Sequence, residues 1–418
     1  MEIIRILFLL CIIKDNDLRE LWYIYNNGAM DSTFNTLQIA ISLVLSGVIV
    51  YITVPLLRSV AFKLDLYDKP DEERKLHTEY IPTLGGIALF LAFFVGFSIS
   101  GFAGQMQGYS YFAAGMLMLF FTGMKDDLVG LSPTKKLLVE VAVGLMLILG
   151  SGIYIDNFYG VLGIGELPFA ASVLITLFTM IVVVNAYNLI DGVDGLAGGI
   201  GVIASLFFCV GFFVADQFAM AMLSAVVAAS LAGYLLHNFH PASIFMGDTG
   251  SLIIGFLLAV QAIQFVGLNE IPAFVEVFGP ISSVMPVAIL MIPLYDTLRV
   301  FILRAKRGDS PFDPGRDHIH HVLIGMGMGH RKTSVTLYGM SIAITMITYL
   351  FSMWNVNVLI MFSVVLAVVV LPGTGIKRMV KGWFSKSSKN TTIIEPHSLP
   401  STRKLKTNKT MRAEYDNA

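Results

Sequence analysis

The sequence is short of charge and of cysteine. Only 14% of its 418 residues are charged, whereas 56% are hydrophobic and the mean hydropathy is +0.74. A water-soluble domain of this length needs a more polar surface, which excludes a soluble globular protein. The two cysteines, Cys11 and Cys209, lie in apolar surroundings. They are too few for a disulfide framework or a cysteine-based zinc site.

Long apolar runs are present instead. They recur along most of the chain and can cross about 30 Å of hydrocarbon as helices, and none shows the alternation of an outer-membrane barrel strand. We therefore predict an all-α, polytopic membrane bundle of about eleven transmembrane helices. The predicted spans are 35–57, 83–101, 111–124, 137–152, 169–187, 200–215, 217–236, 250–267, 279–303, 334–352 and 356–371.

Most of the positive charge lies in alternate loops, and therefore on one side of the predicted bundle. Of the 28 lysines and arginines, 24 lie in three loops and the C-terminal tail, and the loops on the opposite side have none. By the positive-inside rule the basic loops and the C-terminus are cytoplasmic, and the N-terminus is outside. The basic segments are 58–79, 124–137, 304–333 and 372–418, and the opposite loops are 101–110, 152–168, 267–278 and 352–356.

The two ends of the chain differ from the spans. Residues 1–33 are predicted to be an N-terminal extension, because MEIIRILFLLCIIK is too short to span and lacks a small-residue cleavage site, and Met30 is an alternative start. Residues 34–371 form the predicted transmembrane domain. Residues 372–418 are basic and rich in Ser, Thr and Asn, which predicts a disordered cytoplasmic tail.

Every predicted cytoplasmic loop carries a polar motif, and the outer loops have nothing comparable. A charged group costs roughly 2.5 to 3.5 kcal/mol at the centre of a membrane helix, and less near the interface. Several carboxylates at one interface therefore indicate a shared polar site. The five motifs occupy residues 69–86, 124–136, 185–199, 237–251 and 307–324.

Each motif alone also has a structural interpretation. Asp126 and Asp127 are explained equally well as juxtamembrane charges balanced by Lys125, Lys135 and Lys136. The run GDTGS is explained as a helix start, in which the side chain of residue 248 or 249 caps the eighth span.

The remaining polar residues leave similar alternatives open. Asp296 and Arg299, three positions apart, are most simply a structural ion pair. The sequence HxHH is weak evidence for a zinc site without a cysteine or a second cluster. Asp191 and Asp194 are harder to explain structurally, because the glycines around them allow a ligand to approach the backbone closely.

Taken together, the motifs indicate one kind of chemistry. Carboxylate and amide oxygens suit Mg²⁺, or Mn²⁺ in its place, better than zinc. Basic and imidazole groups suit phosphate oxygens, and helix starts such as MGDTGS add backbone donors. We therefore predict a metal-assisted site for a phosphorylated substrate, placed so that a lipid-borne partner enters from the bilayer.

These residues also resemble a known family. NAYNLIDGVDGLAGG resembles the NxxNxxDGxDGL signature of the polyprenyl-phosphate N-acetylhexosamine-1-phosphate transferases of glycosyltransferase family 4, which include the MraY, WecA and TagO enzymes. KLHTEYIPTLGG, DDLVGLSPTKKLLVE, HNFHPASIFMGDTGS and RDHIHHVLI resemble the family's other motifs in the same order. The resemblance runs from about residue 50 to 350. The last loop and GMGHRKTSV are more similar to the WecA and TagO branch than to MraY, which typically reads PxHHHFE there.

The resemblance implies a reaction. Such an enzyme moves an N-acetylhexosamine-1-phosphate, most often GlcNAc-1-phosphate, from a UDP-sugar to undecaprenyl phosphate, giving the lipid-pyrophosphoryl-sugar and UMP. This is the initiating step of a cell-envelope glycan, in the inner membrane with the active site on the cytoplasmic face and no nucleic acid partner. The sugar, the pathway and a homodimer are left open. The alternatives are an MraY-type enzyme and, from another class, a secondary transporter, which usually places its carboxylates near the midplane.

The resemblance also implies roles for individual residues. Three sets result, and Asn188 and Asp191 each belong to two of them. The catalytic set is Asp126, Asp127, Asp191, His318, His320 and His321. The Mg²⁺ ligands are Asp248, Asn188 and Asp191, and the substrate-binding residues are Lys75, His77, Asn188, Asp194, Asn238 and Phe245.

Overall fold

The computed structural model describes residues 32–64, 81–308 and 317–354, with side chains from residue 36 onward. Within these ranges the chain is helical apart from turns and one isolated β-bridge between Asn157 and Glu166, so the predicted all-α class is confirmed. The predicted N-terminal extension, the eleventh span and the tail lie outside the described residues, as do Lys75 and His77.

Helices occupy each of the first eight predicted spans. Their interiors are rich in Leu, Ile, Val, Phe and Ala, as expected of segments that bury backbone polar groups away from water. These helices are α3 (Ser32–Lys63), α4 (Gly85–Ile99), α5 (Tyr109–Val129), α6 (Pro133–Met146), α7 (Phe169–Leu189), α8 (Leu196–Val214), α9 (Phe218–Asn238) and α10 (Gly247–Gly267). Between them lie two short 3₁₀ helices, η1 (Ala103–Gln105) and η3 (Val161–Gly163), and a π-helical turn that continues α6, η2 (Leu147–Ser151).

The rest of the described chain is more broken. It comprises η4 (Leu268–Glu270), α11 (Pro272–Phe278), η5 (Ser282–Val284), α12 (Met285–Ile289), α13 (Met291–Arg307), α14 (Ile319–Gly325) and α15 (His330–Met353). The single helix predicted over 279–303 is therefore wrong. Pro286 and Pro293 lack the N–H that a continuous helix would use, and each lies in the first turn of a separate helix.

Six helices in the described part of the chain are long and apolar enough to cross a membrane, and a seventh arises if the pair Pro272–Phe278 and Ser282–Ile289, bent by 72°, is one span. The six are α3, α7, α8, α9, α10 and α15. The protein is accordingly a multi-pass membrane protein. The count of about eleven spans and the orientation of the termini stay predictions.

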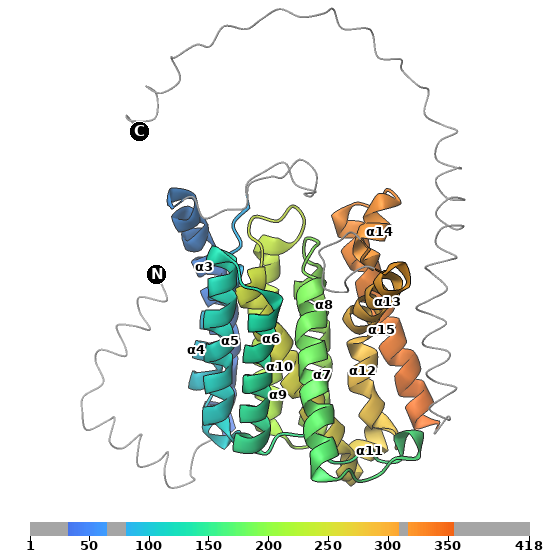
Figure 1. Cartoon of the computed structure of the whole chain (residues 1–418). Coiled ribbons are helices and arrows are strands. Elements are labelled where there is room, and N and C mark those ends of the chain that lie inside the picture. Colours follow the sequence, from blue (N-terminus) through green and yellow to red (C-terminus); the bar gives the residue numbers. More distant parts are fainter. Residues whose placement is uncertain (1–31, 65–80, 309–316, 355–418) are drawn as a thin grey trace, which may run out of the picture. The chain divides into compact units, whose positions relative to one another are not determined.

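Helix α10 lies inside the bundle, in contact with α4, α5, α7 and α8 (Figure 1). Small residues allow this close packing. A Cβ added at Gly86 of α4 would lie 2.1 Å from the backbone nitrogen of Gly250, and one added at Gly123 of α5 would lie 2.5 Å from the Cα of Thr249. The start of α10 therefore packs backbone to backbone against two other helices, as small residues permit in membranes.

The helix ends that carry the polar motifs meet at one end of the bundle. Short loops make consecutive helices antiparallel, so the C-terminal ends of α5, α7 and α9 lie beside the N-terminal ends of α6, α8 and α10. Helix α14 lies toward the same end, shown uppermost in Figure 1. Side chains from distant parts of the sequence are thereby collected there.

Candidate active site

A lysine joins two of the predicted site residues. The Lys136 ammonium, in the first turn of α6, lies 2.6 Å from Oδ2 of Asp126 and 2.7 Å from Oδ2 of Asp248. Asp126 comes from the end of α5 and Asp248 from the start of α10, 122 positions later in the sequence. The second and fourth motifs thus meet at one site. Together with Asp191 of the third motif, described below, Asp126, Asp127 and Asp248 form what we call the carboxylate cluster.

Asp127 fixes the first turn of α10. Its carboxylate accepts hydrogen bonds from the backbone N–H of Asp248 at 2.8 Å, from the backbone N–H of Thr249 at 2.9 Å and from the Thr249 hydroxyl. The cap of the eighth span is therefore supplied by α5, and the interpretation of residue 248 or 249 as the cap is wrong. Burial raises the pKa of Asp127 to about 6, although these hydrogen bonds favour the ionised form.

Asn188, at the end of α7, holds Asp248 from the opposite side. Its amide nitrogen donates to Oδ1 of Asp248 at 2.7 Å and to Oγ of Ser251 at 2.6 Å. Asp248 is thus fixed by Lys136 through one oxygen and by Asn188 through the other. The structure brings together two of the three predicted metal ligands.

Asp191 lies on the turn between α7 and α8 and accepts a hydrogen bond from the backbone N–H of Gly247. Burial, followed by the charges of Asp248 and Asp127, raises the pKa of Asp191 well above its ordinary value. Gly247 has φ +70°, and a Cβ there would lie 2.3 Å from the Thr83 carbonyl oxygen, so only glycine fits. The cluster concentrates negative charge, which a bound cation would offset.

The three predicted histidines stand on α14 and its N-terminal cap, beside the Asp191 turn. A Cβ added at Gly192 would lie 2.8 Å from Nε2 of His320. Burial lowers the pKa of His320 to about 3, which keeps its imidazole neutral. The three rings pack together, with the His320 centroid 4.4 Å from that of His321 and 5.5 Å from that of His318.

The proposed Asp296–Arg299 ion pair is wrong. Asp296 instead accepts hydrogen bonds from Nδ1 of His318 at 3.0 Å and from the backbone N–H of Ile319 at 2.7 Å, while Arg299 donates to the Asp317 carbonyl oxygen at 2.6 Å. Helical spacing brings the two residues of α13 to one side, but the loop that follows supplies better partners. Both side chains therefore position the start of residues 318–321, which we call the histidine segment.

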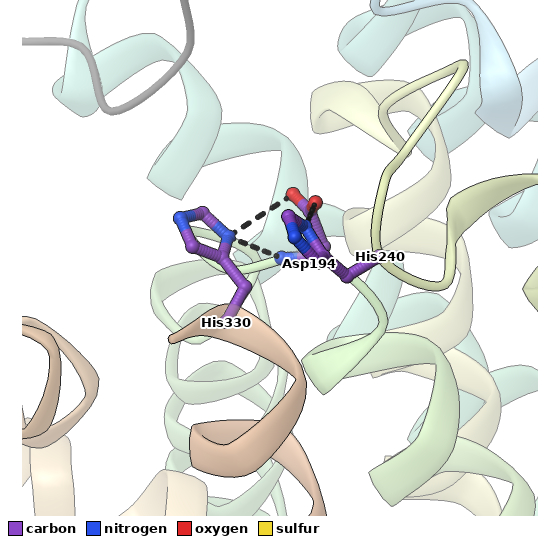
Figure 2. Close-up of side chains that lie close together, drawn as sticks. All are labelled: Asp194, His240 and His330. Atoms are coloured by element: carbon purple, nitrogen blue, oxygen red, sulfur yellow. Dashed lines mark hydrogen bonds and ion pairs between the residues drawn. The ribbon is translucent and has the colours of Figure 1, made fainter. Parts of the chain in front are cut away.

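A second cluster surrounds Asp194, whose side chain is buried (Figure 2). His240 Nδ1 lies 2.7 Å from Oδ2 of Asp194, and His330 Nδ1 lies 3.2 Å from Oδ1. The backbone N–H of Ala242 also donates to Oδ2, at 3.1 Å. Among the described residues, this is the one group of three His, Cys, Asp or Glu residues whose ligand atoms lie within 4.8 Å of one another.

Asn238 and Phe245, two further predicted contacts, lie between these clusters and the first motif. The Asn238 side chain accepts from the backbone N–H of Gly195 at 2.9 Å and donates to the Ile244 carbonyl oxygen at 2.9 Å. The backbone of Phe245 pairs with Pro82 and Gly85. These hydrogen bonds join the described end of the first motif to the fourth motif. Contacts of Asn238 and Phe245 with a nucleoside stay predictions.

Four polar residues of the site were not assigned a functional role from the sequence: Lys136, His240, Asp296 and His330. Lys136 and His240 lie in polar motifs and His330 follows the last one, whereas Asp296 lies in the predicted ninth span, where a carboxylate was the available signal. Lys136 appeared only as a balancing charge for its neighbours, because a single sequence does not reveal that Asp248 lies on its other side.

The sequence is similar to a known family and to several named proteins. Residues 109–266 match the family model described as glycosyl transferase family 4. A Bacillus subtilis protein described as a probable undecaprenyl-phosphate N-acetylglucosaminyl 1-phosphate transferase is 32% identical over 346 residues, covering 79% of this chain and 92% of the relative. A Mycobacterium tuberculosis decaprenyl-phosphate N-acetylglucosaminephosphotransferase is 32% identical, covering 70% and 77%. A Yersinia pestis undecaprenyl-phosphate alpha-N-acetylglucosaminyl 1-phosphate transferase is 30% identical, covering 67% and 75%.

Proposed function

The chain belongs to glycosyl transferase family 4, and from that membership we propose that it transfers GlcNAc-1-phosphate from UDP-GlcNAc to undecaprenyl phosphate. The products are undecaprenyl-pyrophosphoryl-GlcNAc and UMP. The observation that carries the proposal is the Lys136 ammonium held between Asp126 and Asp248 at the meeting point of four helices. A cation set among carboxylates at a helix start suits the phosphate oxygens of both substrates.

The donor set fits Mg²⁺. Asp248 and Asp191 offer carboxylate oxygens, and Asn188, whose amide nitrogen faces Asp248 and Ser251 in this structure, would offer its oxygen once the amide group turns over. No sulfur or imidazole ligand is needed. The raised pKa of Asp191, caused by burial and then by neighbouring carboxylates, indicates a place where a cation would relieve repulsion. When bound, Mg²⁺ would neutralise phosphate oxygens and make the phosphorus more electrophilic.

The reaction we propose is a direct displacement. An oxygen of the lipid phosphate attacks the phosphorus that carries the sugar, and the bond from that phosphorus to the bridging oxygen breaks, releasing UMP. Lys136 would offset charge on the phosphate oxygens, and Asp127 would keep the first turn of α10 in place. His321 would contact the donor, and the buried, neutral His320 would support it from behind. The lipid phosphate is already ionised near neutral pH, so no general base is required.

We also propose that this end of the bundle faces the cytoplasm, with about eleven spans and the N-terminus outside. The support is the distribution of the lysines and arginines, because 24 of the 28 lie in one set of loops and the C-terminal tail, and three of the five motifs lie in those basic loops. A soluble nucleotide-sugar would then meet a lipid from the inner leaflet of the plasma membrane.

The experiment is a transfer assay with purified protein, undecaprenyl phosphate, Mg²⁺ and a panel of UDP-sugars. We expect UMP release matched by a new lipid product, greatest with UDP-GlcNAc and absent in Asp248→Asn. Equal UMP release by Asp248→Asn at limiting Mg²⁺ would contradict the metal assignment. Lack of any lipid product with every UDP-sugar would contradict the proposed activity.

A further inference from the structure

We propose that Asp194, His240 and His330 form a second divalent-cation site, for a transition metal such as Zn²⁺. Both histidines turn Nδ1 toward the same carboxylate, at 2.7 and 3.2 Å from its two oxygens (Figure 2). The three ligand atoms lie within 4.8 Å of one another, a spread that one ion can draw together. The site does not depend on the proposed transferase activity.

The ligand set separates this site from the carboxylate cluster. Two imidazole nitrogens and one carboxylate oxygen suit Zn²⁺, Co²⁺ or Ni²⁺, whereas Mg²⁺ prefers oxygen alone. Three protein ligands also leave a coordination position for water. The His240 side chain is 43% exposed, which gives an ion a route from solvent, while Asp194 is buried.

The arrangement of the two rings suits one ion. Nδ1 of His240 and Nδ1 of His330 face different oxygens of the same carboxylate, at 2.7 and 3.2 Å. The two rings stack with centroids 5.3 Å apart and an angle of 24° between their planes. A metal ion would bind both nitrogens and the carboxylate through the lone pairs that face one another here, in place of the present hydrogen bonds.

The ion would tie together three segments that are far apart in the sequence. Asp194 lies between α7 and α8, His240 between α9 and α10, and His330 opens α15. One turn further along α15, Ser334 donates to the Asp194 carbonyl oxygen at 2.9 Å, and a turn beyond that Tyr338 donates to the Gly195 carbonyl oxygen. The metal would therefore complete a clamp on the turn that carries the catalytic-site residue Asp191.

The first test measures metal directly. Protein purified without a polyhistidine tag or chelator is analysed for bound metals, then stripped and titrated with Co²⁺ in excess Mg²⁺, which keeps the oxygen site occupied. We expect one transition-metal ion per chain and a visible cobalt spectrum typical of four or five ligands, with a higher melting temperature. Failure of well-folded protein to bind Co²⁺ or Zn²⁺ under these conditions overturns the proposal and leaves the cluster as hydrogen bonds only.

Variants identify the ligands. His330→Ala should weaken Co²⁺ binding by at least about 10- to 100-fold, the loss typical even of residues that only support a ligand. His240→Cys should keep the ion and add a sulfur-to-cobalt charge-transfer band, which appears only if position 240 is a ligand. His321→Ala and Asp248→Asn are the matched controls and should retain the original spectrum. An unchanged spectrum in His240→Cys, or loss of the spectrum in His321→Ala, would refute the assignment.

Discussion

At the scale of single residues, Lys136 has the contacts expected of a group that serves the reaction. It is the cation that lies between Asp126 and Asp248, whereas its neighbour Lys135 is exposed. A lysine that only balanced a surface charge would need one nearby carboxylate, and exposed ion pairs of that kind contribute little to folding stability. A lysine held by two carboxylates from different helices is instead preorganised for an anionic substrate.

We predict that Lys136→Ala lowers kcat by at least about 100-fold, the size of effect seen when one preorganised charge-stabilising group is removed. Lys135→Ala is the control and should keep normal turnover, because its side chain is exposed. The measurement is steady-state UMP release with both substrates varied. If Lys136→Ala changes only the KM for one substrate and leaves kcat intact, the residue binds that substrate without stabilising the transition state.

The pH dependence of the reaction should reflect Asp127. Its ionised form accepts the hydrogen bonds at the start of α10, and its pKa is raised to about 6, chiefly by burial. Protonation as the pH falls through that range would weaken this attachment, so kcat should fall below about pH 6. Thr249→Val removes a hydrogen bond to the charged form and should move the fall to higher pH.

The check is a pH–rate profile between pH 5 and 8 at saturating Mg²⁺. Ser251→Ala is a suitable comparison, because Ser251 contacts Asn188 and has no hydrogen bond to Asp127. The assignment to Asp127 fails if the Thr249→Val profile coincides with that of the parent protein.

At the scale of helices, the start of α10 depends on glycines in two neighbouring helices. A methyl group at position 86 would lie 2.1 Å from the backbone nitrogen of Gly250 and 2.6 Å from its Cα, and neither atom can move independently of α10. Overpacking of this kind typically costs about 1–3 kcal/mol. Because Asp248 lies only two residues away, the displacement should also disturb the carboxylate cluster.

Gly86→Ala is therefore expected to lower the melting temperature and to reduce turnover strongly. Gly267→Ala, at the far end of α10 where nothing lies within 4 Å of the added methyl, should be neutral or slightly stabilising. Thermal unfolding and turnover are measured on both variants in the same detergent. Normal activity in a folded Gly86→Ala protein would show that the cluster tolerates movement of the α10 start.

The sequence predicts the bounds of some helices well and of others poorly. Apolar length alone predicts α7, α8 and α9 to within a few residues, because membrane helices satisfy their own backbone hydrogen bonds. The segment 279–303 is apolar enough for one span, but its prolines divide it into separate helices. Proline at a helix start is tolerated, so its presence marks a new beginning as readily as a kink.

At the scale of the whole molecule, the residue types of the site could be predicted but their partners could not. The motifs predict a site at Asp126, Asp127 and Asp248 only in combination, because each motif alone also has a structural interpretation and only several carboxylates at one interface indicate a shared site. Which side chain faces which depends on helix packing. The contact of Asn188 with Asp248 and the contacts of Asp296 with the histidine segment arise only when distant helices meet.

The proposed cytoplasmic face of the site is tested in vesicles. Sealed inside-out vesicles expose the cytoplasmic face, so added UDP-GlcNAc should label lipid in them. Sealed right-side-out vesicles should label little until permeabilised, and Asp126→Asn should abolish labelling in both. Accumulation of UDP-sugar inside the vesicles without UMP release or labelled lipid would support a transporter instead.

The enclosure of α10 affects how the protein responds to the surrounding bilayer. Almost every side chain of α10 is buried against other helices, whereas α3 exposes apolar side chains along much of its length. Changes in bilayer thickness or fluidity act on helices that touch acyl chains. Asp248, at the start of the enclosed helix, is thus insulated from the physical state of the lipid, and the reaction rate should vary little as a cell adjusts its fatty acids to temperature.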